Sequence, residues 1–68
     1  MYYYINLNPQ ENGDNEIHTA DCSYLRLVKD KKFLGDFSNC YDAIIMARRM
    51  GYPNADGCYY CSKSCHRS

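Results

Sequence analysis

The sequence predicts a small α+β domain with a short antiparallel sheet and one main helix, stabilised by a bound zinc ion. Its 68 residues suffice for one domain, and they contain both β-rich apolar runs and one segment with helical spacing. The chain has no Trp and only two Phe. Because a core of this size rarely supplies more than about 3–5 kcal/mol, we expect a metal or a covalent cross-link to stabilise it.

The predicted strands lie in the first half of the chain. Residues 2–8 are β-rich and alternate loosely between two faces, which predicts a strand. Residues 9–15 contain Asn-Gly and Gly-Asp dipeptides and predict a polar loop. Residues 17–27 predict a short helical turn or an irregular segment. Residues 32–37 predict a second short strand, with a bulge expected at Gly35.

A helix is predicted over about residues 39–50. Ser38 and Asn39 are both suitable N-caps, and Asp42 lies in the first turn, where the helix dipole favours negative charge. Gly51 fits the position just past the helix end. The apolar residues recur with helical spacing and form one stripe: Cys40, Ala43, Ile44, Ala47 and Met50. On this stripe we expect Cys40 to act as a small buried apolar side chain.

The five cysteines favour metal binding over disulfide bonds. The first seven residues lack a basic region and a long apolar run, so we expect no signal peptide. No stretch approaches the roughly 20 apolar residues of a membrane span. An odd number of cysteines is also unusual for a disulfide framework. We therefore expect a cytoplasmic protein, in a reducing compartment where clustered cysteines more often hold metal.

The clearest candidate ligands are Cys58 and Cys61. Two cysteines separated by two residues can form a knuckle that places both thiolates on one tetrahedral zinc. Gly57 supplies the backbone freedom that such a turn needs. A redox dithiol is the alternative, but such pairs sit at a helix N-terminus, whereas the predicted helix here ends before Cys58.

A closed structural zinc site needs four ligands, so two more must come from elsewhere in the chain. His18 and Cys22 are four residues apart and could share one ion on a tight turn. Cys65 and His66 are nearer to the knuckle and are the alternatives for the fourth position. The sequence favours Cys22 as the third ligand and His18 as the fourth.

The order of these motifs resembles the Ada-like zinc-binding module. The matching features are His18-x3-Cys22, the Phe37-Ser38 segment before an Ala-containing helix, Gly51-Tyr52-Pro53, and Cys58-x2-Cys61. The resemblance covers about residues 17–61 and leaves residues 1–16 as an N-terminal strand and polar loop of one domain, 1–68. It implies a single structural zinc held by His18, Cys22, Cys58 and Cys61.

The resemblance also bears on activity. In DNA-repair members of the family, the first cysteine of the Cys-x3-Cys pair accepts a methyl group from a phosphotriester. His18 occupies that position here, so the acceptor thiolate is missing. The sequence departs from the family's pattern in two further ways: residues 54–57 are inserted before the Cys58-x2-Cys61 knuckle, and residues 62–66 are added after it.

The sequence therefore predicts a non-enzymatic structural zinc-binding module that binds nucleic acid or a protein, with no membrane and no small-molecule substrate. The net charge is zero, but residues 22–68 hold eight basic against four acidic residues. This excess is well short of a dedicated DNA binder. The candidate surface comprises Tyr59, Tyr60, Arg48, Arg49, Lys63 and Arg67, with at least one of the two tyrosines expected to pack on the core.

Two other functions compete with this prediction. One is a thiol-based alkyl acceptor or redox protein that uses Cys58, Cys61 or Cys65. The other is a structural protein whose first strand forms an exposed edge and pairs with a partner.

Overall fold

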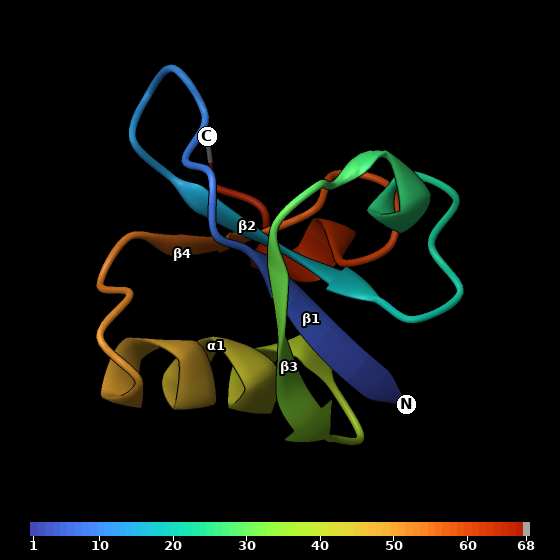
Figure 1. The fold of residues 1–68 in the computed structure, drawn as a ribbon. Helices are drawn as coiled ribbons and strands as arrows, with labels where there is room; N and C mark the ends of the chain where they lie inside the picture. The colour runs from blue at the N-terminus through green and yellow to red at the C-terminus, as the bar shows by residue number, and fades with distance from the viewer. Residues whose placement is uncertain (68) are drawn as a thin grey trace.

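The described residues, 1–67, form four strands, one α-helix and two short 3-10 helices in the computed structural model (Figure 1). The elements, in chain order, are β1 (Tyr2–Asn6), β2 (Asn15–Thr19), η1 (Leu25–Leu27), β3 (Lys31–Asp36), α1 (Cys40–Arg49), β4 (Ala55–Gly57) and η2 (Lys63–Cys65). The predicted small α+β class with one main helix is confirmed. Within residues 1–67, no helix combines the length and the apolarity needed to cross a bilayer.

The four strands form one mixed sheet in the order β3-β1-β2-β4. β1 is antiparallel to both neighbours, whereas β4 is parallel to β2. The sheet therefore differs from the antiparallel one predicted, because the long connection through β3 and α1 lets the chain return in the same direction. β1 is hydrogen-bonded on both sides, so the prediction that it offers an exposed edge is wrong.

The segment from residue 17 to 27 differs from its prediction. Residues 17–19 belong to β2, and only Leu25–Leu27 turn helically. β4 was not predicted either. β2 and β4 are extended because they are paired strands. They align in parallel, with Asn15 opposite Ala55 and Ile17 opposite Gly57.

The predicted bulge at Gly35 is confirmed. The β1–β3 register shifts between Tyr3 and Tyr4, next to the point where Tyr3 faces Gly35. Gly35 has φ +140°, a conformation that side chains with a Cβ rarely adopt. The strand containing it spans residues 31–36, one residue earlier than predicted.

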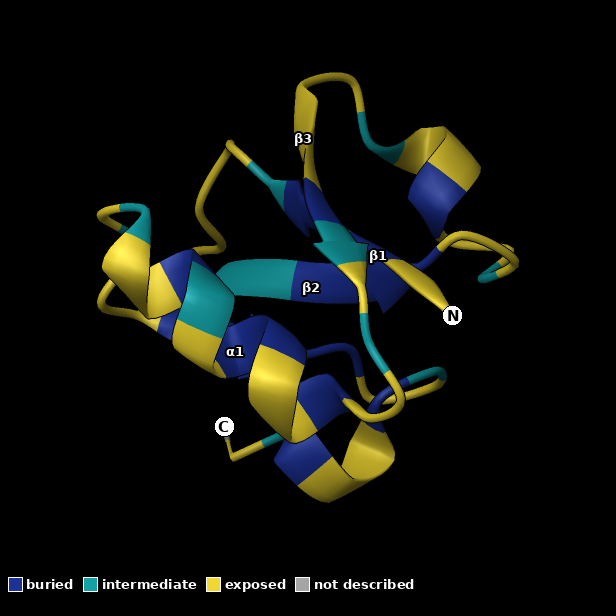
Figure 2. Cartoon of the chain, turned by 90° about the horizontal axis from the view of Figure 1, so that it is seen from below, coloured by how far each residue is buried: buried dark blue, intermediate teal, exposed yellow. Residues whose placement is uncertain are grey.

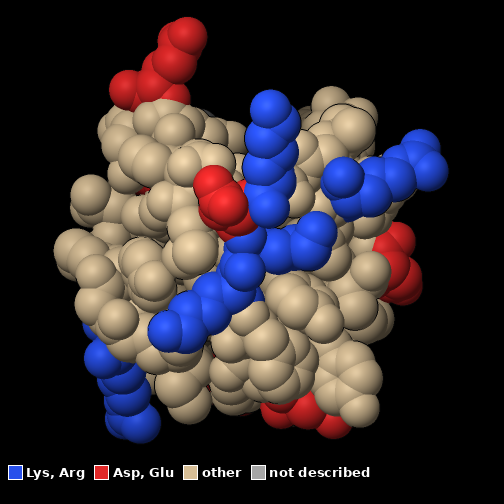
Figure 3. All heavy atoms as spheres, viewed as in Figure 1, with Lys and Arg blue, Asp and Glu red and all other residues tan. Residues whose placement is uncertain are grey.

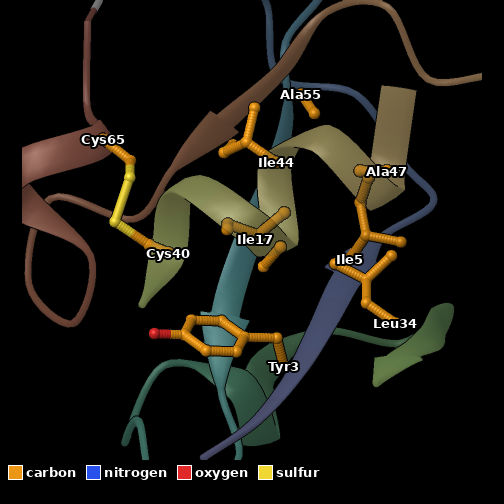
Figure 4. Packing of buried hydrophobic residues seen from close by; sticks show 10 residues of the cluster. Tyr3, Ile5, Ile17, Leu34, Cys40, Ile44, Ala47, Ala55 and Cys65 are labelled. Atoms are coloured by element: carbon orange, nitrogen blue, oxygen red, sulfur yellow. A yellow bond between two sulfur atoms is a disulfide. The ribbon is translucent and has the colours of Figure 1, made fainter. Parts of the chain in front are cut away.

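α1 forms as predicted and covers one face of the sheet (Figure 2). The side chain of Asn39 accepts a hydrogen bond from the backbone N–H of Asp42 at 2.9 Å, which caps the helix. Gly51 follows the helix with φ +101°. The buried cluster between α1 and the sheet comprises Tyr3, Ile5, Ile17, Leu34, Cys40, Ala43, Ile44, Ala47, Ala55 and Cys65 (Figure 4).

One disulfide joins Cys40, at the start of α1, to Cys65 in η2 (Figure 4). Cys40 is buried on the apolar stripe as predicted, but its sulfur is covalently bonded. The expectation that the cysteines would hold metal in place of forming disulfides is therefore wrong for this pair. The remaining cysteines, Cys22, Cys58 and Cys61, are free thiols.

Candidate metal centre

Four potential metal ligands converge at the C-terminal end of β2: His18, Cys22, Cys58 and Cys61. One donor atom from each lies within 4.8 Å of the donor atoms of the other three. His18 and Cys58 are buried, and Cys22 and Cys61 are partly buried. The structure thus brings together the four residues that the sequence favoured.

The parallel pairing of β2 with β4 explains how two of these residues meet. The backbone N–H of Cys58 donates to the carbonyl of Ile17 at 3.0 Å, which sets Cys58 beside His18. A turn after β2, closed by the Cys22 N–H and the Thr19 carbonyl at 3.0 Å, folds Cys22 back toward His18. A second turn, from the Ser62 N–H to the Cys58 carbonyl at 2.9 Å, encloses Cys61.

The distances between donor atoms suit a tetrahedral ion. The Sγ atoms of Cys22 and Cys58 are 3.9 Å apart, and the Nδ1 of His18 lies 3.7 Å from the Cys22 Sγ. Two thiolates on one tetrahedral zinc, with Zn–S bonds of about 2.3 Å, would be about 3.8 Å apart. Three sulfurs and one imidazole are also a common donor set of structural zinc. The site therefore fits zinc in both spacing and chemistry.

Backbone N–H groups point at the sulfur atoms. The N–H of Thr19 donates to the Sγ of Cys61 at 3.3 Å. The backbone of Tyr24 hydrogen-bonds Cys22, and the backbones of Tyr60 and Cys61 hydrogen-bond Cys58. Each of these bonds favours the thiolate over the thiol, which is the form that binds metal.

The three thiols nevertheless differ in acidity without a metal. Burial acts to raise the pKa of Cys61, but hydrogen bonds from His18, Thr19 and Ser62 outweigh it and lower the pKa to about 6. Burial raises the pKa of Cys58 to about 12, despite its backbone hydrogen bonds. Burial also raises the pKa of Cys22. A cluster of this kind holds one negative charge easily, whereas further ionisation needs a cation to compensate it.

Glu16 supports the cluster from the far side of His18. Its Oε1 lies 3.3 Å from the Nε2 of His18, while its Oε2 accepts a hydrogen bond from Gln10 at 2.8 Å. Metal-binding histidines commonly bond a carboxylate through the second ring nitrogen. The sequence analysis missed Glu16 because β2 was not recognised; alternation along a strand would have placed Glu16 on the same face as His18.

The alternative ligands for the fourth position lie elsewhere. Cys65 is bonded to Cys40. His66 directs its Nδ1 at the carbonyl of Gly57, 2.9 Å away, and also lies 3.4 Å from the Asp56 carboxylate. Neither residue belongs to the cluster, so the predicted alternatives to His18 are not supported by the structure.

Gly57 has a role other than the one predicted. Its φ does not lie in the left-handed region, unlike those of Gly13, Gly35 and Gly51. A Cβ at Gly57 would lie 2.4 Å from the carbonyl oxygen of Ser62 and 2.7 Å from the Cβ of Cys65. Glycine is therefore required at position 57, because Ser62 and Cys65, which follow the knuckle, pack directly against its backbone.

Tyr59 and Tyr60 both face outward, with 48% and 67% of their surface exposed, so the prediction that one packs on the core is wrong. The Tyr60 ring stacks on Tyr24, with centroids 4.5 Å apart. Lys63 lies over the Tyr59 ring at 5.1 Å. The arginines of the predicted surface are placed differently: Arg48 and Arg67 line a separate cavity of about 210 Å³ beside α1.

Comparison with protein-family models, curated proteins and solved structures finds no match to this chain. The resemblance to the Ada-like module therefore stays a prediction from the order of motifs.

Proposed function

We propose that the chain is a non-enzymatic zinc-binding module in which one Zn²⁺ stabilises the fold. The observation that carries this proposal is the convergence of four donors within 4.8 Å. These donors come from two segments that are well separated in the sequence, residues 18–22 and 58–61. Holding the segments together through one ion would secure β2, β4 and the knuckle at once.

The complete set of four protein ligands supports a structural role over a catalytic one. Catalytic zinc usually has three protein ligands and an open position for water or substrate, whereas structural zinc is bound by four. Zinc binding contributes about 10–16 kcal/mol of apparent free energy in small zinc domains, and this energy is coupled to folding. That amount is large beside the few kcal/mol of a core this small.

The module would present surfaces to a partner, either nucleic acid or protein. The Ada-like order of motifs supports the same ligand set. Methyl transfer from a phosphotriester is not part of the proposal, since His18 replaces the acceptor cysteine. A cytoplasmic location stays a prediction; in a reducing compartment the Cys40–Cys65 disulfide is the bond that would open.

Native mass spectrometry of the chain, expressed without chelator, tests the proposal. We expect one zinc per chain, lost or strongly weakened in His18→Ala. A Cys40→Ala/Cys65→Ala double variant is the matched control and should retain one zinc, because its sulfurs lie outside the cluster. If chelation left the chain without metal but did not change its circular dichroism or its thermal unfolding, the result would contradict a structural role.

A thiol-based alkyl acceptor is the second candidate, and the low pKa of Cys61 favours it. A thiolate near neutral pH is a nucleophile, and zinc-bound thiolates retain part of that reactivity. Treatment of the zinc-loaded chain with methyl iodide, followed by peptide mapping, tests this function. Selective methylation of Cys61 would support it, whereas no modification or equal modification of all three thiols would count against it.

A further inference from the structure

Three aromatic side chains share the sheet face that α1 leaves uncovered. Along β1, Tyr3 and Ile5 point into the core, so alternation directs Tyr2 and Tyr4 to the opposite face. On the neighbouring strand β3, Phe33 is aligned with Tyr4. These residues form the aromatic platform: Tyr2, Tyr4 and Phe33.

The rings of the platform contact one another but do not bury one another. The Phe33 centroid lies 5.7 Å from that of Tyr2 and 5.3 Å from that of Tyr4. Tyr2 is still 55% exposed and Phe33 50% exposed. A contiguous exposed apolar patch is uncommon on a small protein and often marks an interaction site. Tyr4 is half-buried beside these rings, so the platform offers mainly the rings of Tyr2 and Phe33 to a partner.

Positive charge lies beside the platform. Lys29 precedes β3 and Lys31 begins it; both are exposed, and Lys31 shares the face of Phe33 two residues away. Figure 3 shows basic side chains gathered over β3 and the chain that leads into it. The nearby acidic groups have partners: Asp36 pairs with the Met1 amino group at 2.7 Å, and Asp30 accepts a hydrogen bond from Asn8. Glu16, which also lines the groove described below, accepts a hydrogen bond from Gln10 at 2.8 Å and lies 3.3 Å from His18.

A polar groove of about 370 Å³ lies on the same side of the sheet. Its lining includes Asn6, Asn8 and Lys29, and at its other side Glu16 and the metal ligand His18. Asn6 is aligned with Lys31, one step along β1 and β3 from the pair of Tyr4 and Phe33. The groove thus sets amide groups, which can hydrogen-bond the edge of a base, next to rings on which a base can stack.

We propose that this face binds single-stranded nucleic acid. Unpaired bases would stack on Tyr2, Phe33 and Tyr4, while Lys29 and Lys31 would contact the phosphates. Aromatic side chains on a sheet surface next to basic residues are a recurrent arrangement for single strands, since every base has a face on which to stack. A duplex keeps its bases stacked internally and could use only the lysines. The inference names the partner that the proposed function leaves open, and in that respect it rests on that function. The proposed contacts come from the platform and the lysines, whereas the adjoining groove is also lined by the metal ligand His18.

Fluorescence anisotropy with labelled oligomers of deoxythymidine and uridine, twelve nucleotides long, tests the aromatic platform. The zinc-loaded chain should bind them, and Phe33→Leu should weaken binding by about 5- to 150-fold, the range for loss of one stacked base. The control is Tyr41→Leu, which removes an equally exposed aromatic ring from α1 and should leave affinity unchanged. Native mass spectrometry of each variant must show one zinc per chain, so that weaker nucleic-acid binding is not confused with loss of the metal site.

Salt titration tests the lysines. Two phosphate contacts predict a slope of about −1.4 in log K against log salt, and Lys31→Gln should reduce its magnitude by about 0.7. Arg48→Gln is the control and should leave the slope unchanged. Three results would overturn the proposal. The first is no binding at 50 mM salt, and the second is equal affinity for a duplex. The last is a loss of affinity in Arg48→Gln when Phe33→Leu binds as tightly as the unaltered chain. The last result would favour the surface near α1, and the first would favour a protein partner.

Discussion

The Glu16 carboxylate lies 3.3 Å from the Nε2 of His18, on the side of the imidazole opposite the Nδ1 that faces Cys22. This relationship assigns different partners to the two ring nitrogens. With a metal bound, Nε2–H would donate to Glu16 and the Nδ1 lone pair would be directed at the ion. Glu16 therefore fixes the form of His18 that can bind a metal.

Removal of this carboxylate should weaken metal binding. We expect Glu16→Ala to lower zinc affinity by about 10- to 100-fold, the usual effect of losing a carboxylate that orients a ligand histidine. Competition with a chromophoric chelator measures this affinity. Glu11→Ala, which removes an exposed carboxylate from the preceding loop, is the control. Equal affinities for the two variants would show that Glu16 does not orient His18.

Zinc binding should release about two protons per ion at pH 7.5. The pKa of Cys61 is lowered to about 6, so its thiolate is already present, whereas Cys58 and Cys22 have raised pKa values and must lose protons. The apparent affinity should then rise about 100-fold per pH unit near neutrality, and more steeply below pH 6, where Cys61 is also protonated. Calorimetry in buffers of different ionisation enthalpy measures the proton count. Release of three protons would mean that the metal-free thiols behave as ordinary exposed groups.

Loss of the disulfide should affect stability but not metal content. The bond closes a loop with a sequence separation of 25, which corresponds to about 3.5 kcal/mol of unfolding free energy in the chain-entropy model. We expect Cys40→Ala/Cys65→Ala to unfold at a lower denaturant concentration by about that free energy while binding one zinc. Loss of zinc in this variant would show that η2 must be anchored for the site to form.

Gly57→Ala should disturb the metal centre through backbone packing. A Cβ there would meet the Ser62 carbonyl oxygen at 2.4 Å, so residues 62–65 must shift away. We expect a destabilisation of about 1–3 kcal/mol and weaker zinc binding, since Cys58 follows directly. Gly13→Ala is the control: φ is +90° and nothing lies within 4 Å of its Cβ, so it should carry backbone strain without altering zinc affinity. Unchanged zinc affinity in Gly57→Ala would contradict this account.

The sequence predicted the elements whose own residues specify them. α1 has a cap, an apolar stripe and a terminal glycine, and residues 31–36 carry apolar side chains around a bulge glycine. β2 and β4 could not be predicted in this way. Residues 15–19 are largely polar, and Ala55-Asp56-Gly57 has low β-propensity. β2 is a strand because it pairs with β1 and β4, and β4 because it pairs with β2.

The four clustered donors were predicted because cysteine and histidine spacing reports metal chemistry directly. The disulfide was missed because no local pattern connects Cys40 with Cys65. The odd cysteine count, which argued against disulfides, is explained by three thiols in the cluster and two in the bond. The outward position of Tyr59 and Tyr60 was also missed, although side chains between two ligands of a tight turn have little access to the core.

The parallel alignment of β2 with β4 determines when, as well as where, the four donors can assemble. β2 can pair early with β1, but residues 55–57 must be present before β4 can pair with residues 15–17. Contacts between such distant residues slow folding, because loop closure costs entropy before any pairing compensates it. A nascent chain therefore exposes His18 and Cys22 as an incomplete pair until residue 61 has been added.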